Sequence, residues 1–131
     1  MPIAVKRIYD APRLEDGYRV LVDRLWPRGV AKEKAALAEW LPALAPSDEL
    51  RRWFSHDRGK WAEFKRRYFA ELNEAGSDSE EVCEALIGLR GAAKRGRVTL
   101  LFAASETECN NAVALAEYLA RTKARPKAAR K

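Results

Sequence analysis

The 131-residue sequence is poor in the residues that most often bind metals, since it has two cysteines, Cys83 and Cys109, and one histidine, His56. Two cysteines without a second pair exclude a four-cysteine zinc site and a disulfide-rich framework, and they predict two reduced thiols. A single histidine with no cysteine at ligand spacing would leave carboxylates to supply most of the ligands. We therefore expect no metal site.

Long apolar runs and cofactor motifs are also missing. The longest apolar runs, such as residues 99–104, fall far short of the roughly 18–20 residues that cross a bilayer. The first residues enter strand-like sequence without a secretory signal, so we expect a cytoplasmic protein that makes no membrane contact. The chain has no Walker loop, GxGxxG turn, GxSxG elbow or CxxC pair, and we therefore expect no cofactor.

The basic residues are unevenly distributed. Lysine and arginine number 25 against 19 acidic residues, which gives a formal net charge of +6. Residues 121–131 hold six of the basic residues and no acidic one, so residues 1–120 are formally neutral. With 47% hydrophobic residues the body is expected to fold as one domain over residues 1–121. A basic, disordered tail is expected over residues 122–131.

Hydrophobic patterning predicts alternating strands and helices. Strands are expected at residues 3–9, 18–26 and 98–104. Helices are expected at residues 31–39 and 47–54, from after Asp57 to Gly76, from a capping box at residues 77–80 to Gly96, and at about 108–120. Residues 41–45, interrupted by Pro42, stay open between an edge strand and a loop. Helices before and after a buried strand predict a single layered α/β domain, in which helices cover a small, mainly parallel sheet.

Polar side chains follow two of the predicted strands. In an open parallel sheet, ligands bind outside the carboxyl ends of the strands, where helix N–H groups also favour an anion. An anion-binding pocket is therefore one hypothesis. The alternative is ordinary turn chemistry, in which Asp23 pairs with an arginine and Ser105 or Thr107 caps a helix. The residues in question are Asp23, Arg24, Arg28, Cys109, Asn110 and Asn111.

The stretch DGYRVLVDRLWPRG at residues 16–29 closely resembles the YeaO-like branch of domain of unknown function 488. Similar residues recur at Trp53-Phe54, at His56-Asp57, at residues 98–101 and at residues 110–112. The resemblance covers nearly the whole chain up to about residue 121. It implies a compact α/β domain of the bacterial cytoplasm, and it implies no reaction, because the family is named for having none established.

Two single residues have both a functional and a structural interpretation. Cys109 stands where relatives often have a histidine or a polar residue. A thiol in the first turn of a helix has its pKa lowered and could act as a nucleophile, whereas the alternative is a small buried thiol. His56 is either a general acid or base, or a helix-terminal residue hydrogen-bonded to backbone.

Three functions remain open. The first is an enzyme, or a ligand-binding protein, for a phosphate- or carboxylate-bearing small molecule, because arginine binds such oxyanions bidentately. The second is a nucleic-acid-associated protein that uses the arginines and the basic tail, which the neutral body disfavours. The third is an interaction protein with contacts around Trp26 and Trp40. For the first function the catalytic candidates are Asp23, His56 and Cys109, and the ligand-binding candidates are Arg24, Arg28, Asn110 and Asn111.

Overall fold

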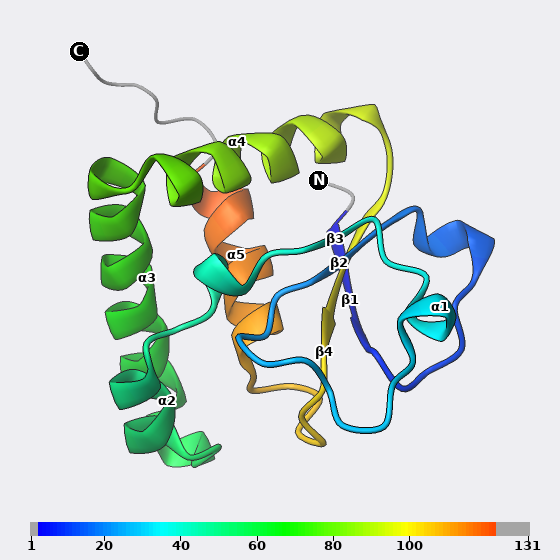
Figure 1. Ribbon diagram of the computed structural model, residues 1–131. Coiled ribbons are helices and arrows are strands. Elements are labelled where there is room, and N and C mark those ends of the chain that lie inside the picture. Colours follow the sequence, from blue (N-terminus) through cyan, green and yellow to red (C-terminus); the bar gives the residue numbers. More distant parts are fainter. Residues whose placement is uncertain (1–2, 123–131) are drawn as a thin grey trace.

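A computed structural model describes residues 3–122, in which four parallel strands form one sheet with the order β1-β4-β2-β3 (Figure 1). β4 is central, because it pairs with β1 on one side and with β2 on the other. The prediction of an α/β domain with a parallel sheet is confirmed. The strands are β1 (Ile3–Arg7), β2 (Tyr18–Leu21), β3 (Glu39–Trp40) and β4 (Val98–Phe102).

The helices cover the two faces of the sheet unequally. In Figure 1, α2 to α5 lie on one side of the strands, whereas α1 lies on the other side. The chain includes short 3-10 turns at η1 (Leu14–Asp16), η2 (Pro42–Leu44) and η3 (Arg58–Lys60). The helices are α1 (Lys32–Ala35), α2 (Asp48–Phe54), α3 (Trp61–Asp78), α4 (Glu80–Arg95) and α5 (Asn111–Thr122).

The core follows from the apolar sequence of β4, whose five residues are all buried. Successive side chains of a strand point to opposite faces. Leu100 accordingly packs in the large core with residues of α2 to α5, whereas Leu101 packs with Leu21 in a smaller cluster that includes Ala35 of α1. Leu21, Leu100 and Leu101 are all fully buried. The central strand therefore has no contact with water on either face.

The helix predicted over residues 31–39 is wrong in its length, because α1 ends at Ala35. Ala36 has a left-handed backbone (φ 53°). The buried Arg19 guanidinium donates hydrogen bonds to the carbonyl oxygens of Ala35 and Ala36 at 2.7–3.2 Å. A tertiary contact thus ends the helix early, and the chain enters the edge strand β3 at Glu39. Residues 42–44, in the segment left open from sequence, form η2.

Other boundaries differ as well, since the strands predicted over residues 3–9 and 98–104 end at Arg7 and Phe102. The strand predicted over residues 18–26 ends at Leu21, so the residues from Asp23 onward belong to a loop. The helix expected to end at Gly76 continues to Asp78. Gly76 therefore lies inside α3 rather than at its end, and a Cβ added there would make an ordinary contact, 3.6 Å from the Leu86 side chain.

The last helix begins three residues later than predicted. Asn110 precedes it and accepts a hydrogen bond from the Val113 N–H with its side-chain oxygen (2.9 Å), as an N-cap residue does. α5 then extends to Thr122. The predicted disordered tail lies, from residue 123 onward, outside the described residues. Between residues 3 and 122, no helix has the length and apolar character that crossing a membrane requires.

Candidate functional site

A cavity of about 450 Å³ lies at the carboxyl ends of β2 and β4. The loop after β2, the start of α2 with His56 beyond its end, and residues 103–104 after β4 contribute to its lining. Parallel order brings these segments together, because both strands end at the same edge of the sheet. Five of the seven residues predicted from sequence line this cavity: Asp23, Arg24, Arg28, His56 and Asn111.

Asp23 is held by hydrogen bonds from the residue that follows β4 and from α5. One carboxylate oxygen accepts from the Ala103 N–H (2.9 Å), and the other accepts from the Asn111 side-chain amide (3.1 Å). Asn111 also donates to the Val22 carbonyl, which fixes its orientation. Burial raises the pKa of Asp23, although these hydrogen bonds and the charge of His56 act in the opposite direction. Asp23 forms no ion pair with any described residue, so the expected pairing with an arginine is absent from this part of the chain.

Two arginines of the same loop differ in how firmly they are held. Arg24 donates to the Pro46 carbonyl (3.0 Å) and lies 3.4 Å from a carboxylate oxygen of Asp48. Arg28 is exposed, and its backbone carbonyl accepts from the Tyr9 hydroxyl (3.0 Å). The Arg28 guanidinium has no ion pair within residues 3–122. Arg24 is therefore positioned by the protein, whereas Arg28 is available to a ligand.

Two tryptophans fix the loop that carries these arginines. The Trp40 indole N–H donates to the Asp23 carbonyl (2.8 Å), and the Trp26 indole N–H donates to the Val30 carbonyl (2.7 Å). Their rings meet edge to face with centroids 5.4 Å apart. Such aromatic pairs contribute about 0.5–1.5 kcal/mol beyond the area they bury. The loop is thus held in place at the sheet edge.

His56 reaches the cavity from an unusual backbone turn. Ser55 and His56 both have left-handed conformations (φ 46° and 56°), which end α2. Each such residue costs of the order of 1–3 kcal/mol, and this strain is common at functional sites. The imidazole lies against Phe54, with ring centroids 5.8 Å apart. The turn therefore places an exposed histidine on the wall of the cavity that also holds Asp23.

Cys109 and Asn110 do not line the cavity. Cys109 is 7% exposed and packs in the large core. Asn110 is fully buried and donates to the Glu106 carbonyl (2.8 Å) while it caps α5. The chemical roles assigned to these two residues from sequence stay predictions, and their described contacts are structural.

Glu106 organises the loop in which these residues lie. Its carboxylate accepts from the Glu108 and Cys109 N–H groups (2.9 and 3.1 Å) and from Arg58 at 2.7 Å. The backbone N–H of Glu108, the Arg58 side chain and the Cys109 N–H together lower the pKa of Glu106 to about 2. The loop is thereby joined to η3, near His56.

Sequence reasoning missed the contribution of α2 to the lining. Asp48 and Arg51 lie one turn apart at its start, 3.6 Å from each other, and Asp48 also contacts Arg24. Asp48 is an acid in the first turn of α2, a position that does not by itself indicate a site. Phe54 also lines the cavity and stacks on Phe64 with centroids 4.3 Å apart. No local signal separates these lining residues from ordinary helix residues.

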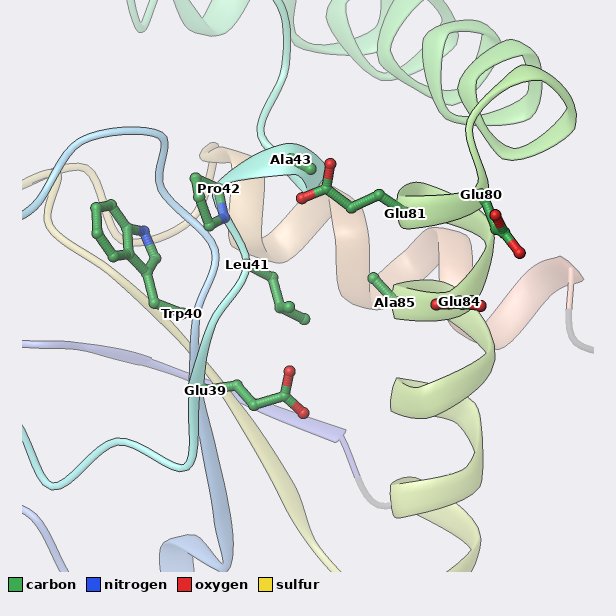
Figure 2. A pocket seen from close by; sticks show the side chains of 9 residues that line it. All are labelled: Glu39, Trp40, Leu41, Pro42, Ala43, Glu80, Glu81, Glu84 and Ala85. Atoms are coloured by element: carbon green, nitrogen blue, oxygen red, sulfur yellow. The ribbon is translucent and has the colours of Figure 1, made fainter.

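A second cavity, of about 530 Å³, lies between the β3–η2 segment and the start of α4. Figure 2 shows the Glu39 and Glu81 side chains extending toward the space between these elements. Glu80 and Glu84 also line it, and no arginine or lysine among residues 3–122 does. Within residues 3–122, no group of three or more histidine, cysteine or acidic side chains is placed to hold a metal ion. Because like charges repel, this cavity does not suit an anion.

Comparison with known proteins gives consistent matches along the chain. Residues 2–131 match the family described as "Inactive DUF488-N3 subclade". The chain is 40% identical over 119 residues to "Uncharacterized protein YeaO" of Escherichia coli (strain K12), covering 91% of this chain and 97% of the relative. It is 36% identical over 117 residues to "Uncharacterized protein Rv3073c" of Mycobacterium tuberculosis (strain ATCC 25618 / H37Rv), covering 89% and 92%. No solved structure matches the chain.

Proposed function

The chain belongs to the DUF488 family, in the subclade described as inactive, and from this premise we propose that it binds a small phosphate- or carboxylate-bearing molecule without transforming it. The ligand occupies the cavity at the carboxyl ends of β2 and β4. Arg28 binds its anionic group, and Arg24 and Arg51 add positive charge at the same cavity.

The observation that carries the proposal is the convergence of these arginines on one cavity. Arg24 and Arg28 come from the loop after β2, and Arg51 comes from α2. Arginine suits an oxyanion because its planar fork donates two parallel hydrogen bonds. Arg24 is already held by Pro46 and Asp48, so less conformational freedom is lost when it meets a ligand.

Two observations support binding without turnover. The chain belongs to a subclade of the family that is described as inactive. Cys109, the nucleophile candidate, is buried in the core and does not line the cavity. Asp23 and His56 remain as polar groups in the cavity, and in this proposal they contact the ligand rather than move a proton.

The test is a titration of the full chain with inorganic phosphate and with succinate, followed by calorimetry. Arg28→Ala should weaken binding about 10- to 100-fold, since a hydrogen bond to a charged group contributes about 1.5–3 kcal/mol. Arg52→Ala is the matched control, because Arg52 lies on α2, is exposed and does not line the cavity. Equal affinities for the two variants, or no binding by the wild type, would contradict the proposal. Release of product from p-nitrophenyl phosphate above the level of an Asp23→Asn variant would contradict binding without turnover.

A further inference from the structure

Asp23 is a negative group in a cavity that otherwise suits an anion. Its carboxylate accepts two hydrogen bonds, from the Ala103 N–H and from the Asn111 amide. An ionised carboxylate has about four acceptor positions, so acceptor capacity remains for a ligand. The other carboxylate of the cavity, Asp48, lies beside Arg24 and Arg51. Asp23 has no such cation within 4 Å among residues 3–122.

The charge of Asp23 is therefore poorly compensated by the protein. Burying a carboxylate without a cationic partner is unfavourable, and amide hydrogen bonds satisfy its oxygens without neutralising it. The charge of His56 acts on Asp23 across the cavity, but the two side chains form no ion pair among residues 3–122. A ligand that brings a permanent positive charge would supply what the cavity lacks.

We propose that Asp23 binds an ammonium group of the ligand, so that the cavity takes a small zwitterion rather than a simple anion. This inference rests on the proposed function and names the class of its ligand. Arg28 binds the oxyanion at one end of the ligand, and Asp23 binds the amine at the other. A hydroxyl group would fill one acceptor position of Asp23 but would leave the charge unpaired.

The walls of the cavity fit the part of the ligand between these groups. Trp26, Phe54 and Phe64 line it, and they offer apolar surface to a short carbon chain. A volume of about 450 Å³ accommodates an amino acid or an amino phosphate ester. Phosphate and carboxylate share the chemistry that Arg28 recognises, so the experiment compares both.

The experiment uses two matched pairs of probes with the full chain. Ethyl phosphate is compared with O-phosphoethanolamine, and propionate is compared with 3-aminopropionate, each by calorimetry at neutral pH. The amino member of at least one pair should bind the wild type about tenfold or more tightly than its partner, as one charge-assisted contact would give. The pair that shows the preference identifies the oxyanion.

Asp23→Asn should change the two members of a pair in opposite directions. Removing the carboxylate eliminates its attraction for the amine and also its repulsion of the anion, so the amino probe weakens and the simple anion binds equally or more tightly. A cavity that is merely damaged would weaken both. Asp10→Asn is the matched control, because it makes the same charge change at an exposed position outside the cavity. Asp23→Glu keeps the charge and should retain the preference if Asp23→Asn fails to fold.

The outcomes separate this inference from the proposed function. Tight binding of ethyl phosphate or propionate with no amino preference would overturn the zwitterion and leave anion binding intact. An amino preference that survives in Asp23→Asn would also overturn it, because another group would then hold the amine. If none of the four probes binds the wild type, both proposals fail.

Discussion

Arg19→Met should destabilise the protein strongly, because Arg19 holds a buried charge network where β2 begins. The side chain is 4% exposed. Its guanidinium donates to the Asp16 carboxylate at 2.6 Å and to the carbonyls of Ala35 and Ala36. Asp16 also accepts from the Lys6 ammonium and from the Arg13 N–H, both at 3.0 Å. Methionine fills a similar space without any donor.

The expected loss of stability depends on the groups that remain around Asp16 in the variant. Removing one partner of a buried ion pair typically costs about 3–5 kcal/mol, because the other charge is left unpaired. Lys6 and the Arg13 N–H still compensate Asp16, which favours the lower end, about 3 kcal/mol. This is a large share of the roughly 5–15 kcal/mol by which domains are stable.

Urea unfolding followed by circular dichroism measures the effect. With a denaturant slope of roughly 1.5 kcal/mol/M, a loss of about 3 kcal/mol lowers the midpoint by about 2 M. Lys6→Met is the control, because Lys6 is the more exposed partner of Asp16 and should cost only about 1 kcal/mol. A loss for Arg19→Met below about 1 kcal/mol, or equal to that for Lys6→Met, would refute the reasoning.

Two further predictions concern the same sheet and the loop near the cavity. Gly17→Ala should lower the thermal unfolding midpoint far more than Gly29→Ala. Both glycines have positive φ (68° and 77°), but a Cβ at Gly17 would lie 2.4 Å from the Arg97 carbonyl oxygen, whereas a Cβ at Gly29 meets nothing within 4 Å. Glu106→Gln should make the stability of the fold less sensitive to acid. The pKa of Glu106 is lowered from 4.5 to about 2, so its ionised form stabilises the fold above pH 4.5, and this contribution is lost as the pH falls toward 2. An unchanged acid-unfolding curve for Glu106→Gln would contradict it.

Elements buried on both faces could be predicted from the sequence, and elements set by tertiary contacts could not. β4 is a continuous apolar run between Gly96 and a polar cluster, which is typical of a central parallel strand. Residues 31–39 have good helical composition, but Arg19 reaches them from β2 and ends the helix at Ala35. Local propensity gives way to such long-range contacts.

Some residues of the candidate site could likewise be predicted from the sequence, and others could not. Asp23 and Arg28 could be placed at the cavity because they lie in the segment through which the chain leaves the β2 region, and parallel strands end at one edge. Asp48 could not be placed, because its position depends on how α2 packs. Glu71 of α3 accepts hydrogen bonds from the Ser47 N–H (2.9 Å) and hydroxyl (2.6 Å), and this contact across 24 residues sets the start of α2.

The formal neutrality of residues 1–120 conceals a separation of charge that bears on which cavity takes an anion. Residues 51–67 hold seven basic and two acidic side chains, whereas residues 68–84 hold six acidic side chains and no basic one. The first segment contributes Arg51 and His56 to the arginine-lined cavity, and the second contributes Glu80, Glu81 and Glu84 to the acidic cavity. An excess of one sign of charge in a cleft raises the local concentration of the opposite ion. We therefore expect an anion approaching the body to be drawn to the carboxyl ends of β2 and β4, where arginines outnumber Asp23 and Asp48, rather than to the start of α4. Net charge alone could not have revealed this preference, because the two segments nearly cancel.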